Sequence, residues 1–471
     1  MVRSTTGPVR FPGSPFGGSP LSGSPFRRAV DRRSFLRGVA GVGLAATLPA
    51  GLAACSSDDE PTAAPQPAGD PDAPAKLTFW TWTTGIDKVV AIWNKKNPTQ
   101  QVTVSAQAQG EELLTKIVTA HRAGNPPDLI HAEYQALPVL ITNGVTADLS
   151  GLAAEVKGAF TDGTWGLTSF GGRTYAIPQD VGPMMLYYRS DLFEQFGLTV
   201  PKTWDEFGAL AEQVRSKDSK RYLATFSSGD PGWFAGLSEQ AGANWWTNDN
   251  GTWTVSINDE PTKKLASFWG DLVNAGTLQG KPMYTPEWNK AMSDGTLLAW
   301  PSAVWGAGVL QGVAPSTKGK WTMVPMPQWD SATPTTGFWG GSATAIAAKS
   351  KQSAQAQKFV KWLNTDPEAL EAFVSFGGIY PAATAGQSTP ALSKAPAMMP
   401  NQPGFFTDAA AIAKTARGFT WAPNVNVTYS QYSDLFAKAI QTKGDFAAAV
   451  DQLQSASVAD LKKQGFQIKE S

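Results

Sequence analysis

The sequence contains very little cysteine and histidine. Only one of its 471 residues is Cys, and two are His, His121 and His131. One Cys cannot close a disulfide within the chain, and two His cannot by themselves form a zinc site. The sequence therefore excludes a disulfide scaffold, and it predicts no metal centre, no thiolate site and no cofactor.

An excess of basic charge is also missing. Lys and Arg number 39 and Asp and Glu number 39, and after residue 55 the chain carries 32 basic and 38 acidic residues. A mildly acidic surface with dispersed charges is a poor match for the phosphate backbone of nucleic acid. We therefore expect no nucleic-acid partner.

The N-terminal region lacks an apolar stretch long enough to cross a bilayer. Residues 38–52 are weakly apolar but number only 15, whereas a spanning helix needs about 20. The stretch suits a signal peptide, because the pair Arg32-Arg33 precedes it and Leu-Ala-Ala-Cys at residues 52–55 ends it. The arginine pair resembles a twin-arginine export signal. The segment ending in Cys55 resembles a bacterial lipobox, whose Cys is lipidated and becomes the mature N-terminus.

These signals divide the N-terminal region into a signal peptide and a tether. Residues 1–55 are predicted to be a leader with a twin-arginine lipoprotein signal peptide, and residues 56–75, rich in Ser, Asp, Pro and Ala, a flexible tether. Two acyl chains on Cys55 would anchor the protein at the extracytoplasmic face of the cell membrane. The alternatives are a chance buried cysteine and a soluble secreted protein with a fortuitous Cys.

Strand and helix signals alternate after the tether. Residues 77–82, 101–106 and 128–130 have strand composition, and helical spacing of apolar residues covers 86–97 and 111–123 between them. This order favours an α/β protein with a mostly parallel sheet and helices on both faces. Further helices are predicted at 203–217, 261–275, 353–363, 367–376, 407–417, 430–441 and 446–463, and further strands at 297–300 and 321–324.

Several segments carry a resemblance to a known family. The most specific lies at residues 175–207, with Tyr-Ala-Ile-Pro at its start and Val-Pro-Lys-Thr-Trp-Asp-Glu-Phe at its end. Weaker matches follow the same order along the chain at 124–129, 295–300, 337–348, 359–370 and 422–424. Together they resemble extracellular solute-binding protein family 1, the carbohydrate-binding lipoproteins of ABC importers that include maltose-binding protein.

The resemblance implies a type II periplasmic-binding-protein fold, with two lobes, each a mostly parallel sheet flanked by helices, joined by hinge strands near residues 180–188, 337–344 and 380–383. Lobe one would comprise 76–183 plus 340–380, and lobe two 184–339 plus 381–471. The family's members bind without catalysis, so the resemblance implies a protein that is not an enzyme. Its partners would be a small carbohydrate and the transmembrane subunits of an ABC permease, and it would act as a monomer.

Tryptophan is abundant, with all 18 Trp after residue 76. A pyranose ring has a flat C–H face that stacks on an aromatic ring and a rim of hydroxyls that bind carboxylates and amides. Strand ends and the loops after them are where open α/β sheets bind ligands. Candidate ligand-binding residues chosen on these grounds and by the resemblance are Trp82, Glu133, Tyr134, Asp180, Trp233, Trp305, Trp339, Trp421 and Tyr432.

These candidates rest on different arguments. Trp82 closes a predicted strand and Glu133 follows one, whereas the resemblance places a stacking aromatic at Trp305. Asp180 lies at a predicted hinge, where a structural hydrogen bond is the alternative. By contrast, four other Trp lie on apolar helix faces and are predicted to be core residues: Trp93, Trp204, Trp269 and Trp362.

Other functions stay open from the sequence. The same fold could bind a polyamine, a peptide or a chelate, although the excess of Trp favours a sugar. A glycoside hydrolase would need two carboxylates across a cleft, and Asp180 and Glu133 are a conceivable pair that no motif supports. A surface lipoprotein without a ligand is a third alternative.

Overall fold

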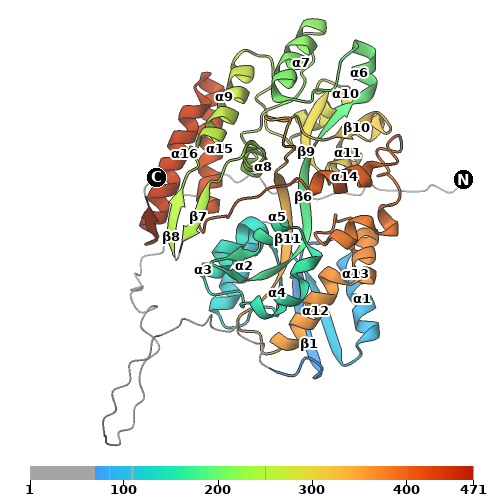
Figure 1. The fold of residues 1–471 in the computed structure, drawn as a ribbon, viewed down its shortest axis with the longest axis vertical. Coiled ribbons are helices and arrows are strands. Elements are labelled where there is room, and N and C mark those ends of the chain that lie inside the picture. Colours follow the sequence, from blue (N-terminus) through green and yellow to red (C-terminus); the bar gives the residue numbers. More distant parts are fainter. Residues whose placement is uncertain (1–68, 84, 108–110, 250, 470–471) are drawn as a thin grey trace, which may run out of the picture. The chain divides into compact units, whose positions relative to one another are not determined.

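Figure 1 shows the fold as a computed structural model, which describes residues 69–469 apart from 84, 108–110 and 250. The predicted signal peptide, with Arg32, Arg33 and Cys55, lies outside the described residues, as do residues 56–68 of the expected tether.

The expected tether is shorter than the sequence suggested. Residues 70–73 form a hydrogen-bonded turn, and strand β1 begins at Ala75. Asp72 pairs with Lys358 at 2.7 Å, and the side chain of Gln355 donates to the carbonyl of Asp70, also at 2.7 Å. Both partners belong to one helix, so its contacts fold residues 70–75 onto the protein, which the polar composition did not reveal.

The strands of the described residues are β1 (Ala75–Thr81), β2 (Gln100–Ala106), β3 (Leu129–Glu133), β4 (Ser169–Phe170), β5 (Arg173–Thr174), β6 (Ala176–Arg189), β7 (Trp246–Asp249), β8 (Thr252–Val255), β9 (Ala299–Ala303), β10 (Trp321–Val324), β11 (Phe338–Ile346) and β12 (Gln467–Lys469). The α-helices are α1 (Ile86–Lys96), α2 (Glu111–Arg122), α3 (Leu137–Thr142), α4 (Ser150–Val156), α5 (Asp162–Gly166), α6 (Ser190–Phe196), α7 (Trp204–Lys217), α8 (Pro231–Ala241), α9 (Glu260–Asn274), α10 (Pro286–Asp294), α11 (Gly306–Val313), α12 (Ser353–Thr365), α13 (Pro367–Ala372), α14 (Phe405–Ala413), α15 (Val425–Thr442) and α16 (Phe446–Lys463).

A seven-stranded mixed sheet organises these elements. Its order is β10-β6-β11-β3-β1-β2, with β9 also paired to β6. β1 is parallel to β2 and β3, but β11 is antiparallel to β3 and β6, and β6 is antiparallel to β9 and β10. The α/β class is confirmed. The expectation of mostly parallel strands is right for β1 to β3 and wrong for the rest, because the chain leaves the parallel part along β6 and returns along β11.

Three segments far apart in the sequence lie side by side at β6. The first half of β6 pairs with β11, and its second half pairs with β9 and β10 (Figure 1). On the remaining edge, the N–H of Val181 donates to the carbonyl of Tyr380 and the N–H of Ala382 to that of Gln179, each at 3.1 Å. β6, β11 and residues 380–382 are the three segments in which the family resemblance placed hinge crossings.

Local sequence signals explain the bounds of several helices. Thr203 and Glu206 form a capping box at the start of α7: the hydroxyl of Thr203 accepts from the N–H of Glu206 at 3.1 Å, and the Glu206 carboxylate accepts from the N–H of Thr203 at 3.3 Å. The apolar face that follows buries Trp204 and Phe207 completely. Helices α9, α12 and α16 begin within one residue of the predicted positions.

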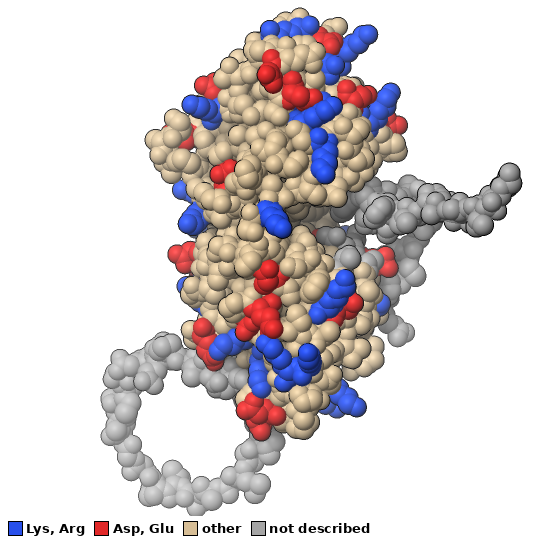
Figure 2. Space-filling model, turned by 90° about the vertical axis from the view of Figure 1, so that its right-hand side faces the viewer, with Lys and Arg blue, Asp and Glu red and all other residues tan. Residues whose placement is uncertain are grey.

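The surface carries charges of both signs. On the face shown in Figure 2, Lys and Arg side chains are interspersed with Asp and Glu, in keeping with the near balance of charge in the sequence. None of the helices within the described residues is both long and apolar enough to span a membrane.

Candidate ligand-binding site

The ring of Trp82 lies flat on the imidazole of His131. Trp82 directly follows β1, and His131 lies in β3, the strand beside it. The ring centroids are 3.5 Å apart and the planes are inclined by 15°. Trp82 is partly exposed, whereas His131 is buried. Burial lowers the pKa of His131 to about 3, so the imidazole is neutral at physiological pH.

Asp180 lies in β6, where the three segments predicted to be hinge crossings meet. Its carbonyl accepts a hydrogen bond from the hydroxyl of Tyr134 at 2.9 Å, and its carboxylate accepts one from the hydroxyl of Ser342 in β11. Burial raises the pKa of the Asp180 carboxyl to about 6, and the negative charge of Glu133 adds to the rise. Asp180 therefore makes the structural hinge hydrogen bond that the sequence left open, while its side chain stays partly exposed.

Trp305 and Trp339 form an aromatic pair over β6. Their ring centroids are 4.6 Å apart at 63°, and Nε1 of Trp305 donates to the carbonyl of Trp339 at 3.1 Å. The register of β11 against β6 shifts between Phe338 and Gly341, and such a bulge turns a side chain away from its regular direction. A Cβ on Gly182 would lie 2.1 Å from the carbonyl oxygen of Trp339 and 3.2 Å from Nε1 of Trp305, so only glycine permits this approach.

Gly341 allows Tyr134 and the backbone of Asp180 to approach β11 closely. It has a φ of 105°, and a Cβ there would lie 2.7 Å from Cε2 of Tyr134 and 3.0 Å from the carbonyl oxygen of Asp180. His131, on which Trp82 stacks, bonds Ser342, and Nε1 of Trp305 lies near Gly182 and Gly340. The two pairs of rings therefore border one stretch of β6 and β11, at residues 180–182 and 339–342.

Asp230, Tyr284 and Tyr429 join this region, although the sequence interpretation did not select them. The Asp230 carboxylate caps α8 by accepting from the N–H of Trp233 at 2.9 Å, and the Trp339 side chain also hydrogen-bonds to it. Burial raises the pKa of Asp230 to about 7. Burial raises the pKa values of Tyr284 and Tyr429; the negative charge of Asp230 adds to the rise at both, after that of Glu239 at Tyr429. In the sequence Asp230 precedes a Pro, and this pattern alone explains its presence as a helix cap. The pattern gives no sign that the same carboxylate also contacts Trp339.

The negative charge of Glu133 affects two residues of this region, Asp180 and Tyr429. It ends β3 opposite Ser342 of β11, and its negative charge raises the pKa values of Asp180 and Tyr429 after the larger effect of burial. Because Tyr429 lies in α15, the carboxylate at the end of β3 is within electrostatic range of a helix from the C-terminal part of the chain.

Two of the predicted ligand residues lie in the core, which corrects those predictions. Trp233 and Tyr432 have 0% of their surface exposed. Nε1 of Trp233 donates to the carbonyl of Pro301, and the hydroxyl of Tyr432 donates to the carbonyl of Ser227, each at 3.0 Å. The apolar faces of α8 and α15 turn both rings inward, so they support the site from behind and offer no surface to a ligand.

Trp421 lies at the edge of the region. It is 6% exposed, and its ring packs on Phe419 and Trp246 at centroid distances of 4.9 and 5.8 Å. Its edge also approaches Tyr429, at 6.0 Å and 89°. Trp421 therefore reaches the site through Tyr429.

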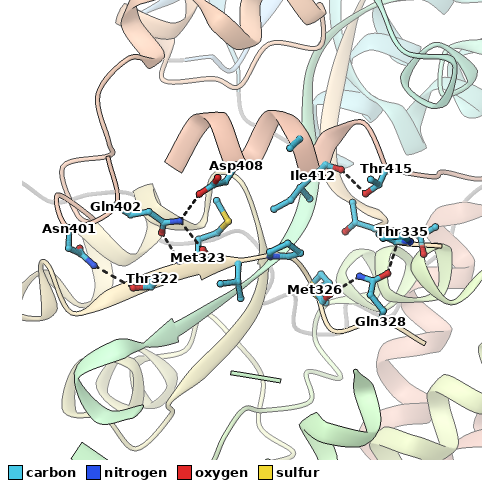
Figure 3. Close-up of a pocket in the computed structure, with 15 residues that line it drawn as sticks. Thr322, Met323, Met326, Gln328, Thr335, Asn401, Gln402, Asp408, Ile412 and Thr415 are labelled. Carbon is cyan, nitrogen blue, oxygen red and sulfur yellow. Dashed lines mark hydrogen bonds between the residues drawn. The ribbon is translucent and has the colours of Figure 1, made fainter. Parts of the chain in front are cut away.

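A larger pocket lies elsewhere. About 520 Å³ in volume, it is bordered by β10 and α14, and its polar side chains already bond within the protein (Figure 3). Gln402, for example, bonds both backbone groups of Met323, at 2.8 and 2.9 Å, and the Asp408 carboxylate at 3.1 Å. None of the predicted ligand residues lines this pocket. The hollow beside Trp82 has a volume of only about 10 Å³, too small for more than a water molecule.

The side chains of the candidate site are mainly aromatic rings and carboxyl groups. Among the residues that the structure describes, no three His, Cys, Asp or Glu side chains are grouped to hold a metal ion. Partly exposed aromatic rings can stack on a flat apolar face, and carboxyl groups can bind hydroxyl or amine groups on a rim. The arrangement therefore fits a ligand with both features.

Known proteins resemble this chain along most of its length. An arabinooligosaccharide-binding protein of Bacillus subtilis (strain 168) is 23% identical over 320 residues, which cover 65% of this chain and 73% of that protein. A lactose-binding protein of Rhizobium radiobacter is 23% identical over 305 residues, covering 61% and 69%. The solved galacto-N-biose/lacto-N-biose I-binding protein of the ABC transporter of Bifidobacterium longum superposes with a TM-score of 0.75 at 26% identity, over 84% of this chain and 99% of that one.

The fold is shared more widely. The sugar-binding protein MalE of Xanthomonas citri superposes with a TM-score of 0.72 at 18% identity, over 83% of this chain and 98% of that one. The family model for bacterial extracellular solute-binding proteins matches residues 80–370. The predicted family and the two-lobed type II fold are thus confirmed, and the chain belongs to the bacterial extracellular solute-binding protein family.

Proposed function

We propose that this protein captures a mono- or oligosaccharide outside the cytoplasm and delivers it to an ABC permease. The observation that carries the proposal is the meeting of aromatic rings and carboxyl groups at residues 180–182 and 339–342, where β6 and β11 run side by side. The relatives support the choice of cargo, because the two similar proteins of Bacillus subtilis and Rhizobium radiobacter and the solved neighbour from Bifidobacterium longum are named for binding oligosaccharides or disaccharides.

The proposed contacts follow from the chemistry of a pyranose. Trp82 and Trp305 are partly exposed and would offer ring faces to its C–H face. Asp180 and Asp230 would bind its hydroxyls, together with Glu133. Because burial raises the pKa values of both Asp carboxyls, to about 6 and about 7, either can accept or donate a hydrogen bond near neutral pH, as a hydroxyl requires.

Hinge closure would couple binding to transport. We place lobe one at residues 76–183 plus 340–380 and lobe two at 184–339 plus 381–471, with β6, β11 and residues 380–382 as the crossings. A sugar that contacts both lobes only when they are closed shifts the population to the closed form, which the permease can then recognise. The hollow of about 10 Å³ beside Trp82 is consistent with a site that must open to admit a ligand.

Anchoring and the absence of catalysis complete the proposal. Export through the Arg32-Arg33 signal and lipidation of Cys55 would hold the protein at the outer face of the cell membrane. The protein would bind without chemistry, as a monomer, with no cofactor. Support for the non-catalytic role comes from its family, whose members are binding proteins.

Isothermal titration calorimetry of purified residues 56–471 tests the proposal. The ligands are arabino-, galacto- and gluco-oligosaccharides, with spermidine and a tripeptide as controls for other cargoes. We expect saturable binding of one sugar class, weakened about tenfold or more by Trp305→Ala. The matched control is Trp362→Ala, because that ring is also partly exposed but packs on Trp93 and Phe359 instead. Binding of a control cargo and of no sugar would refute the assignment.

A further inference from the structure

His131 is a polar ring in the core of the sheet. It is 2% exposed, and its neighbours in β3, Ile130 and Ala132, are apolar. An apolar side chain at this position would avoid the cost of removing an imidazole from water. Packing alone therefore does not explain the choice of His.

The ring nitrogens of His131 lie within hydrogen-bond distance of side chains on three strands. Nδ1 lies 2.9 Å from Oγ1 of Thr81 at the end of β1. Nε2 lies 2.6 Å from Oγ of Ser342 in β11 and 2.9 Å from Nε2 of Gln179 in β6. Gln179 is itself fixed, because its Oε1 accepts from the hydroxyl of Thr344 at 2.7 Å. Because Ser342 donates to Asp180, Nε2–H of His131 donates to Ser342 and Nδ1 accepts from Thr81. The imidazole therefore cannot tilt or rotate without breaking bonds to β1 and to the hinge strand β11, and it lies against the Gln179 amide of β6.

The free face of this fixed ring carries Trp82. The two rings are stacked at 3.5 Å and 15°, and Trp82 lies just past the end of β1, where the regular ladder no longer constrains it. Stacking on a neighbour with a fixed plane sets the plane of the tryptophan. The same imidazole is linked through Ser342 to the Asp180 carboxylate. One buried ring thus connects a candidate stacking surface with a candidate hydroxyl-binding group.

We propose that His131 is a positioning residue, which holds the Trp82 ring at a fixed angle to the hinge strands so that a sugar can stack on it. The role rests on the proposed function, because it acts through Trp82 and not by contact with the ligand. A residue that only stabilised the core would change the free energy of unfolding and leave the orientation of Trp82 unchanged.

Fluorine NMR of protein labelled with 5-fluorotryptophan tests the positioning without any ligand. The Trp82 signal is the one that disappears in Trp82→Phe. We expect that signal to shift and broaden in His131→Asn, which removes the stacked ring, and to change less in His131→Phe, which keeps a ring but loses its hydrogen bonds. The control is His121→Asn, since His121 is also buried but lies in α2. A Trp82 signal unchanged in both His131 variants overturns the proposal, whether or not the protein binds sugar.

Calorimetry with the sugar found for the wild type then tests the consequence. His131→Asn should weaken binding about three- to tenfold, the effect of one aromatic pair. In a Trp82→Ala background the same substitution should change the affinity less than twofold, because its effect passes through Trp82. A loss that persists in that background overturns the proposal. If the wild type binds no sugar, the proposed function fails and the fluorine spectrum alone decides the role of His131.

Discussion

The close approach of β11 to Gly182 can be tested by adding one methyl group. In Gly182→Ala the new Cβ would lie 2.1 Å from the carbonyl oxygen of Trp339, 3.0 Å from its carbonyl carbon and 3.2 Å from Nε1 of Trp305. Since non-bonded heavy atoms settle at about 3.5 Å, the backbone of β11 must move by roughly 1 Å or more. Overpacking of this kind costs about 1–3 kcal/mol.

The movement would also affect the candidate site. Trp305 donates to the same Trp339 carbonyl, and its Nε1 also lies close to Gly182, so the methyl group would displace the pair. We therefore expect Gly182→Ala to lower the free energy of unfolding by about 1–3 kcal/mol and to weaken ligand binding about tenfold or more.

Urea unfolding followed by circular dichroism, with calorimetry for the ligand, measures both effects. The matched control is Gly308→Ala in α11, where a Cβ would meet nothing within 4 Å. Because alanine is the better helix former, the control should raise the free energy of unfolding by about 0.5–1 kcal/mol. Wild-type stability and affinity in Gly182→Ala would show that the two strands do not approach as closely as we infer.

Three further predictions follow from other residues. Trp233→Ala should lower the free energy of unfolding by about 3–5 kcal/mol, because the ring is fully buried, whereas Trp305→Ala should mainly weaken ligand binding. Urea unfolding and calorimetry on both variants measure the two effects. A Trp305→Ala variant that loses stability and a Trp233→Ala variant that loses only affinity would contradict the prediction. Glu239 is buried, accepts from the N–H groups of Phe338 and Phe419 at 2.7 and 3.3 Å, and has a pKa raised by burial from 4.5 to about 8. Between pH 6.5 and 8 the folded state therefore binds more protons than the unfolded state, so the free energy of unfolding should fall by about 1–2 kcal/mol as pH rises, and an equally steep fall in Glu239→Gln would sink this explanation. Cys55→Ser in the full chain should move the protein from the membrane fraction to the soluble fraction of exporting cells, and a protein that stays in the membrane fraction would argue against lipidation at this residue.

Local patterns in the sequence predicted the bounds of some regular elements well, while several short helices and strands, such as α3, α10 and β7, were not predicted. α16 and β10 have the predicted bounds, and α7 begins at its capping box, because apolar spacing and helix caps act over a few residues. β12 was missed, since it consists of three residues paired with β8 more than 200 residues earlier in the chain. The antiparallel part of the main sheet was missed for the same reason: strand direction depends on which distant strand lies alongside.

The site residues show the same limit. Trp93, Trp204 and Trp269 were rightly placed in the core from their helix faces. Trp233 was placed in the site and lies in the core, because a Trp at the start of a helix gives the same local signal whether it points inward or outward. Asp230 was overlooked since its role as a helix cap is visible locally, whereas its contact with Trp339 is not.

The sequence by itself determined the family, the α/β class and the expectation of an exported, lipidated protein that binds a sugar. These follow from residue types at fixed spacings, which are properties of short segments. Only the tertiary structure decided which of the aromatic side chains surround the hinge. That selection depends on the bulge in β11 and on the approach of Trp339 to Gly182, a pair some 157 residues apart in the chain, and contacts over such distances leave no periodic pattern in the sequence.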